Sequence, residues 1–570
     1  MKFSKLTLAI AATLGASASF NAVALDLYVD TKTKQLFAEP GRGRVLLGAY
    51  EKVTEPSSAP GVSHSITPAS APAATATSAE VAAIKQDLEL KTNEIKALEE
   101  HAAEESKPSS VHVKLDDGIH FATKDGNFTA GINGRLQVDS QSNVNQQLPV
   151  DYLNTNLAGQ PVNQLGVPSE LNNGATLRRA RLGVEGTFFK NTDYKFEYDF
   201  TRGNGLNAGG ITDAFIRYNF STPFSVKVGA FKEPFSLEEA TSNRYLTFIE
   251  RNMAVNTFVD NLNTYKVGIG ANYSADRWLV GSSFQTEGVG GYSNAYGNNA
   301  LTGSTGSAIG ANGGVNRNGG GGDTSWEANA RLAGTPWFES KTKFLHVGAS
   351  GSYININNNY TGDMKYSNGG VIFANGIGNN VDRTGILSTG NLTAGNKGAK
   401  NSFQADHLTR FGAESSLVYG PFSAQGEYIQ TDVSGHGYAS NETLNGYYGY
   451  ATYFLTGESR NYSAKTGSWG RIKPNQNFDM KGGWGAWEIA TGYDYLNLND
   501  HVIQGGRAST VKGGINWYPN SHVRVMANYI HALDISSVNA ALVTGALNYT
   551  SRAFNKADLD MIETRVQLDW

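Results

Sequence analysis

The feature that most constrains this fold is an alternation of apolar and polar residues with a period of two. The last fourteen residues read ADLDMIETRVQLDW. From Ile562 to Trp570 the even-numbered residues are apolar except for Thr564, and from Glu563 to Asp569 the odd-numbered residues are polar. Because successive side chains of a strand point to opposite faces, this segment predicts a strand with one apolar and one wetted face.

The same alternation recurs between residues 111 and 570. It is clearest in four segments: 181–188, 193–200, 265–273 and 523–529. In the third segment, the odd-numbered residues from Tyr265 to Tyr273 form the predicted apolar face. Charged residues on one face of many strands need water, which a barrel with a wet lumen supplies while the other face meets lipid. A β-sandwich fits each single segment equally well, so the barrel prediction rests on their number.

Composition narrows the alternatives. The chain has 570 residues with no cysteine, 66 glycines, 27 tyrosines, 26 phenylalanines and 17% charged residues. The absence of cysteine excludes disulfide scaffolds, thiol nucleophiles and cysteine-ligated clusters. A net charge of -4 gives no indication of a nucleic-acid partner. A glycine- and aromatic-rich chain with few charges is typical of a β-solenoid, a secreted adhesin or an outer-membrane barrel.

The first 24 residues predict a signal peptide. Lys2 and Lys5 precede a short apolar stretch, and Ala22-Val23-Ala24 has the small-x-small pattern of a cleavage site. No later stretch approaches the roughly 18 consecutive apolar residues of a membrane-spanning helix. The sequence therefore predicts an exported chain that does not stop in an inner membrane.

Three segments precede the predicted barrel. Residues 25–56 form a small N-terminal segment with possible strands at Gln35–Ala38 and Val45–Ala49. Residues 57–78 are rich in Ser, Ala, Pro and Thr, which is typical of a flexible linker. Residues 79–105 space apolar residues by alternating steps of three and four over about three heptads, which predicts a periplasmic coiled-coil helix. A solitary amphipathic helix is the alternative, and the apolar seam suits dimers or trimers.

The predicted fold class is all-β, a transmembrane antiparallel β-barrel over residues 111–570. At about 10 residues per crossing plus turns and loops, this length accommodates about 16 strands around a water-filled lumen. Spans 288–326 and 355–402 are rich in Gly, Asn, Ser and Thr and predict long external loops. Ser221-Thr222-Pro223 predicts a short turn.

Several collinear stretches resemble the phosphate-selective porin O and P family: 125–139, 177–200, 228–252, 453–478, 482–500 and 515–534. The resemblance covers the barrel but not residues 25–110. It implies a homotrimeric porin of about 16 strands in the outer membrane of a Gram-negative bacterium, in contact with lipid and lipopolysaccharide. It also implies that the loop after the strand 226–231 folds into the lumen as a constriction. The terminal Trp570 resembles the signal that the barrel-assembly machinery reads during insertion.

An anion channel needs fixed positive charge where its pore is narrow. Strand parity and the resemblance together select nine candidate anion-binding residues. Those on the wetted strand faces are Arg135, Arg179, Arg181 and Arg217, those in the candidate constriction loop are Arg244 and Arg251, and those in the stretch 453–478 are Arg460, Arg471 and Lys473. Phosphate-selective members of the family carry a basic residue at the position that matches Arg244. Ten acidic residues face inward by the same parity, so ordinary paired lumen charges are the competing interpretation.

The sequence therefore predicts an outer-membrane diffusion channel for small anions, with phosphate or polyphosphate as the expected solute. A weakly selective general or organic-anion porin is one alternative, and a structural or adhesin barrel is another. We expect no enzyme, cofactor or bound metal, because the histidines lie outside any HExxH or serine-nucleophile motif.

Overall fold

The computed structural model describes residues 25–30, 36–37, 44–50, 78–105, 111–115, 118–147, 171–201, 210–221, 223–260, 265–288, 326–356, 373–378, 381–382, 385–390, 392, 404–436, 441–537 and 554–570. The chain divides into two compact units, residues 1–102 and 103–570. The predicted signal peptide, residues 57–77 of the predicted linker and residues 289–325 of the first Gly/Asn-rich span lie outside the described residues.

The N-terminal part contains a small sheet and one long helix. Strands β1 (Leu25–Asp30), β2 (Leu36–Phe37) and β3 (Arg44–Tyr50) pair antiparallel in the order β2-β1-β3. Two of these strands match the predicted ones, whereas β1 was not predicted. The predicted helical segment forms α1 (Ser78–Glu105), and its apolar side chains Leu88, Ile95 and Leu98 are exposed. The coiled-coil assembly of this helix stays a prediction. Among the described residues, no helix has the length and apolar character needed to cross a membrane.

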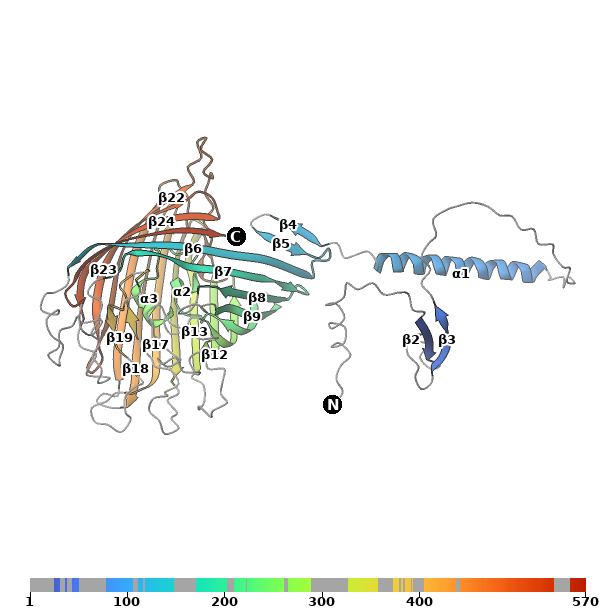
Figure 1. Ribbon diagram of the computed structural model, residues 1–570, viewed down its shortest axis with the longest axis horizontal. Coiled ribbons are helices and arrows are strands. Elements are labelled where there is room, and N and C mark those ends of the chain that lie inside the picture. Colours follow the sequence, from blue (N-terminus) through green and yellow to red (C-terminus); the bar gives the residue numbers. More distant parts are fainter. Residues whose placement is uncertain are drawn as a thin grey trace. The chain divides into compact units, whose positions relative to one another are not determined.

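Sixteen antiparallel strands of the described chain close into a barrel, as predicted (Figure 1). They are β6 (Phe128–Gln147), β7 (Gly174–Phe188), β8 (Thr192–Asp199), β9 (Gly210–Ser221), β10 (Phe224–Phe231), β11 (Lys266–Ser274), β12 (Trp278–Gly288), β13 (Trp326–Ser340), β14 (Lys343–Asn355), β17 (Gln404–Tyr419), β18 (Phe422–His436), β19 (Asn441–Phe454), β22 (Ala486–Asn499), β23 (Gln504–Tyr518), β24 (Val523–Ser536) and β25 (Asp558–Asp569). The last strand, β25, closes the barrel by pairing with β6. A hairpin of β4 (His112–Lys114) and β5 (Ile119–Ala122) extends the sheet beside the start of β6.

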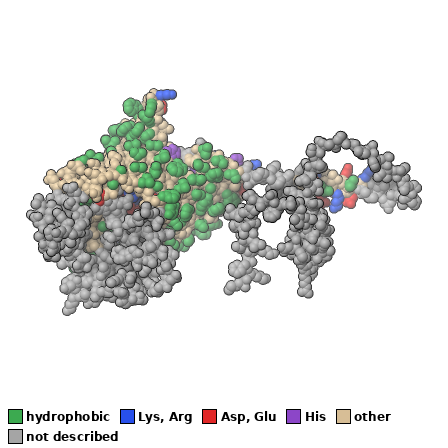
Figure 2. Space-filling model, viewed as in Figure 1, with side chains coloured by type: hydrophobic (Ala, Val, Ile, Leu, Met, Phe, Trp, Pro, Cys, Tyr) green, Lys and Arg blue, Asp and Glu red, His purple; other side chains and the backbone are tan. Residues whose placement is uncertain are grey.

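The two faces of the strands follow the predicted alternation. On β25, Ile562, Val566 and Leu568 are exposed on the outside, whereas Glu563 and Arg565 are buried on the inside. Hydrophobic side chains cover much of the described barrel wall in Figure 2. An apolar outer band is what a strand facing lipid requires.

Tyr265 corrects one detail of this alternation. Its side chain was predicted on the apolar outer face, but it is 4% exposed and its hydroxyl accepts a hydrogen bond from Arg181 Nη1 at 3.0 Å. The strand begins only at Lys266. Tyr265 is therefore a loop residue that the period of two does not constrain.

The two ends of the barrel differ in the length of their connections. At one end, β13–β14 and β17–β18 are joined by residues 341–342 and 420–421, whereas at the other end residues 232–265 and 356–403 form long connections. Outer-membrane barrels keep short turns in the periplasm and long loops outside. One connection at the short-turn end is long, residues 455–485, and contains β20 (Tyr462–Ser463) and β21 (Ser468–Trp469).

Loop segments fill much of the lumen. The constriction loop, residues 232–265, carries α2 (Leu237–Ala240) and α3 (Met253–Phe258), and every residue of α3 is buried. Helix α3 packs against β18, β19 and β22 and against β15 (Ala374–Asn375), which pairs with β16 (Leu387–Ser388) in the second Gly/Asn-rich span. Figure 1 shows α2 and α3 among the barrel strands. The predicted inward fold of the loop after β10 is confirmed, and an apolar core occupies the lumen beside β17 to β25.

Candidate pore site

Buried ion pairs anchor the constriction loop to the barrel wall. Arg410 of β17 binds Glu233 through two hydrogen bonds of 2.9 and 2.7 Å and donates a third to the Phe258 carbonyl at 2.7 Å. Arg565 of β25 pairs with Asp139 and donates to the Ile249 carbonyl at 2.6 Å. Both arginines are almost fully buried. The bidentate pair of Arg410 with Glu233 orients the loop as well as attracting it. The pair of Arg565 with Asp139 joins β25 to β6, and Arg565 holds the loop through the Ile249 carbonyl and through Glu250 at 3.1 Å.

Arg251 has a similar role inside the loop. Its Nε lies 2.9 Å from Glu239 Oε2, its Nη1 lies 3.6 Å from Asp260 Oδ2, and it donates to the Thr241 carbonyl at 3.2 Å. The side chain is 3% exposed. This candidate therefore cross-links two parts of the constriction loop, and the structure leaves little of it facing the lumen.

Three other candidates gather around the carboxylate of Glu197 on β8. Arg135 Nη2 lies 3.1 Å from Glu197, Arg181 Nη1 lies 2.9 Å from it, and Arg244 Nη2 lies 3.7 Å from it. Arg181 also pairs with Asp199 at 2.7 Å. We call Arg135, Arg181 and Arg244 the arginine cluster. It brings together one residue from β6, one from β7 and one from the constriction loop.

The arginine cluster holds more donors than the surrounding acceptors occupy. Nε and Nη1 of Arg135, Nε of Arg244 and Nδ2 of the neighbouring Asn133 are buried without a hydrogen-bond acceptor in the described part of the chain. Asn133 Oδ1 accepts from Arg244 Nη2 at 3.4 Å, which places the amide beside the cluster. The three guanidiniums thus share the carboxylates of Glu197 and Asp199, and Arg244 also lies 3.9 Å from Asp569, the ion-pair partner of Arg471. The cluster has an excess of positive charge and of N–H groups.

Two candidates have ordinary ion pairs at the edge of this region. Arg471, in the connection 455–485, lies 2.7 Å from Asp569, which is also 3.9 Å from Arg244. Arg217 on β9 lies 2.7 Å from Asp193 and keeps 43% of its side chain exposed. Arg471 therefore links the inserted connection to the last strand, and Arg217 remains open to solvent.

The remaining candidates lie elsewhere in the lumen or at its mouth. Arg179 is buried and donates to Gln137 Oε1 at 3.0 Å. Arg460 stacks its guanidinium 3.8 Å from the ring centre of Trp469. Among the described residues, neither arginine has a carboxylate within ion-pair distance. Lys473 is exposed in the connection 455–485.

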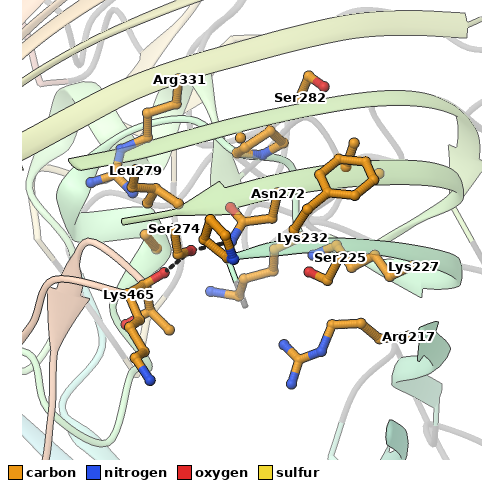
Figure 3. Close-up of a pocket in the computed structure, with 18 of the residues that line it drawn as sticks. Arg217, Ser225, Lys227, Lys232, Asn272, Ser274, Leu279, Ser282, Arg331 and Lys465 are labelled. Atoms are coloured by element: carbon orange, nitrogen blue, oxygen red, sulfur yellow. Dashed lines mark hydrogen bonds between the residues drawn. The ribbon is translucent and has the colours of Figure 1, made fainter. Parts of the chain in front are cut away.

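A cavity of about 520 Å³ lies between the wall strands β9 to β13, the start of the constriction loop and the connection 455–485 (Figure 3). Its charged lining residues are Arg217, Lys227, Lys232, Arg331, Lys465, Asp193 and Glu233. Lys232 pairs with Glu239, and Arg331 pairs with Glu414. Within the described chain, Lys227 and Lys465 have no carboxylate partner, and Lys227 Nζ lies 4.1 Å from the ring centre of Phe231.

Sequence reasoning missed both of these lysines. Lys227 carried a usable signal, because its neighbour Val228 faces outward and parity then directs Lys227 to the lumen. Lys465 has no strand parity, because it lies in a connection, but it lies in the same family-like stretch 453–478 that selected Arg460, Arg471 and Lys473.

A closed barrel with an apolar outside and a charged, narrowed lumen defines an outer-membrane channel. The family model for phosphate-selective porin O and P matches residues 166–541. The chain belongs to this family, and it is an anion channel of the outer membrane of a Gram-negative bacterium.

The chain is also similar to individual proteins. Porin O of Pseudomonas aeruginosa is 27% identical over 447 residues, which cover 74% of this chain and 87% of that protein. An uncharacterized protein of Caulobacter vibrioides is 26% identical over 429 residues, covering 74% of this chain and 72% of that one. Among solved structures, the anion-selective porin from Comamonas acidovorans superposes with a TM-score of 0.42 at 10% identity, covering 78% of this chain and 100% of that chain.

Proposed function

We propose that the channel prefers inorganic phosphate or polyphosphate and that the arginine cluster is its selective point. The observation that carries this proposal is the set of buried N–H groups on Arg135 and Arg244 that lack acceptors. Phosphate oxygens accept hydrogen bonds and match the fork of guanidinium donors, so they can replace part of the lost hydration. Glu197 and Asp199 offset part of the positive charge. The offset keeps binding moderate, and a channel needs moderate binding because a tight site blocks flux.

We further propose that the cavity forms a second anion-binding site, on the periplasmic side of the arginine cluster. It is lined by the connection 455–485, which starts and ends at the short-turn end of the barrel. The unpaired Lys227 and Lys465 supply its positive charge. Arg179 and Arg460 add positive potential within the lumen, and Lys473 and Arg217 attract anions where they are exposed. Passage needs no energy input, because a diffusion channel lets its solute move down the concentration gradient.

The assembly is also part of the proposal. Family membership supports a homotrimer that contacts lipid and lipopolysaccharide, with no catalytic role for the barrel. The heptad spacing of residues 79–105 supports α1 as a periplasmic coiled coil. Trp570 is proposed as the signal for the barrel-assembly machinery. Its backbone exchanges hydrogen bonds with Gly134, and a Cβ at that glycine would lie within 2.1 Å of the Trp570 ring. The terminal aromatic therefore packs on a site that only glycine leaves open.

Phosphate titration of a chloride current tests the selective point. The wild-type protein is reconstituted in a planar bilayer with potassium chloride, and phosphate is added in the millimolar range. We expect the chloride current to fall, because phosphate occupies the arginine cluster longer than chloride does. An anion-selective current that phosphate leaves unchanged indicates a general or organic-anion porin. A folded trimer without conductance indicates a structural barrel.

A further inference from the structure

We propose that Glu442, Asp500 and His501 bind a transition-metal dication of the Zn²⁺ class at the extracellular rim of the barrel. The sequence contains no metal motif here, because the ligands come from a strand and from a separate connection. Glu442 is the second residue of β19, and Asp500 and His501 follow the last residue of β22. Both places lie at the long-loop end of the barrel.

The three side chains already converge. A carboxylate oxygen of Glu442, one of Asp500 and a ring nitrogen of His501 all lie within 4.8 Å of one another. Ligands about 2.0–2.2 Å from a zinc ion are at most about 4 Å apart, so small side-chain movements complete the set. His501 has 77% of its side chain exposed, which leaves room for water on the open side of the ion.

A buried carboxylate oxygen points independently to a cation. The side chain of Glu442 is fully buried, and its Oε2 accepts from the backbone N–H groups of Val502 and Ile503 at 2.9 and 3.1 Å. Its Oε1 is buried without a hydrogen-bond partner in the described part of the chain. Burying an unpartnered carboxylate oxygen is costly, and a bound cation offsets that cost.

A second cluster of the same residue types shows the difference. His531, Asp558 and Asp560 also converge at the long-loop end. There Asp560 Oδ1 accepts from the Tyr529 hydroxyl at 2.6 Å and lies 2.8 Å from His531 Nδ1, and its Oδ2 accepts from Asn145 at 3.1 Å. Its carboxylate is satisfied without an ion. Of these two clusters, only that of Glu442, Asp500 and His501 therefore combines converging ligands with a buried carboxylate oxygen that lacks a hydrogen-bond partner.

The ligand set also selects the ion. One imidazole with two carboxylates suits Zn²⁺ and its transition-metal neighbours, whereas Mg²⁺ and Ca²⁺ prefer sites made of oxygen alone. Bound metal would join the start of β19 to the β22–β23 connection, where Asp500 Oδ2 already accepts from the Thr443 N–H at 2.6 Å.

Zinc titration calorimetry on the full-length trimer, purified without a histidine tag, tests this site. We expect one Zn²⁺ per chain, and about 10- to 100-fold weaker binding in His501→Ala and Glu442→Gln. His501 is exposed, so its variant keeps the fold even if the Glu442 variant does not. The matched control is His407→Ala, because His407 pairs with Asp406 at 3.2 Å and belongs to neither metal-type cluster of the described residues.

Three results would overturn the proposal. The wild-type protein binds no Zn²⁺ saturably, or His501→Ala binds as tightly as the wild type, or excess Ca²⁺ displaces the zinc. Retained binding in His407→Ala together with lost binding in His501→Ala supports it.

Discussion

Replacing Arg244 with Gln isolates the charge that the constriction loop contributes to the pore. The Arg244 side chain is 13% exposed and lies 3.7 Å from Glu197 and 3.9 Å from Asp569, so it has no close ion pair. A unit charge at about 4 Å from a passing anion contributes about 1 kcal/mol even at the dielectric constant of water. That free energy corresponds to about a fivefold change in a ratio of populations. We therefore expect Arg244→Gln to lower the anion-to-cation permeability ratio about fivefold.

The reversal potential under a potassium chloride gradient in a planar bilayer measures this ratio. Gln keeps a donor for Asn133, so the variant removes charge more than shape. Arg277→Gln is the matched control, because Arg277 is exposed in the turn between β11 and β12, outside the arginine cluster. An unchanged reversal potential in Arg244→Gln would refute the reasoning. An equal shift in both variants would show that total charge, rather than the constriction, sets selectivity.

Three further predictions concern stability, measured as the temperature at which the folded protein unfolds on a detergent gel. Arg410→Ala leaves Glu233 buried with Lys266 at 3.4 Å as its remaining cation. We therefore expect the free energy of unfolding to fall by about 3–5 kcal/mol. An unchanged unfolding temperature contradicts this prediction. Burial and the negative charge of Glu427 raise the pKa of Glu238 to about 8. The folded state then keeps a proton that the unfolded chain releases above its lower pKa, so stability falls from pH 5 to pH 8, and Glu238→Gln should flatten that fall. If the unfolding temperatures of the wild type and Glu238→Gln fall equally from pH 5 to pH 8, the raised pKa of Glu238 does not cause the fall. Deletion of residues 79–105 should lower the midpoint if α1 assembles the trimer, and an unchanged midpoint makes α1 a spacer.

The local sequence predicted the alternating faces of the barrel strands. Strand parity is a property of the extended backbone, so Arg565 and Glu563 were placed inside and Val566 outside without any knowledge of neighbours. Parity failed at Tyr265 because that residue precedes its strand. The inward loop came from the family resemblance, because nothing local in residues 232–265 dictates which way a loop folds.

The sequence by itself determined the barrel, the family and the inward face of strand charges such as Arg565 and Glu563. Only the tertiary structure decided which of those charges remain available. Buried ion pairs hold the guanidiniums of Arg410, Arg565 and Arg251. By contrast, Arg135 and Arg244 have N–H groups without a hydrogen-bond acceptor in the described part of the chain. The physical reason is the distance along the chain over which each property is set. Side-chain direction follows from adjacent residues, whereas an ion pair joins residues that are far apart in the chain and meet only when the barrel closes.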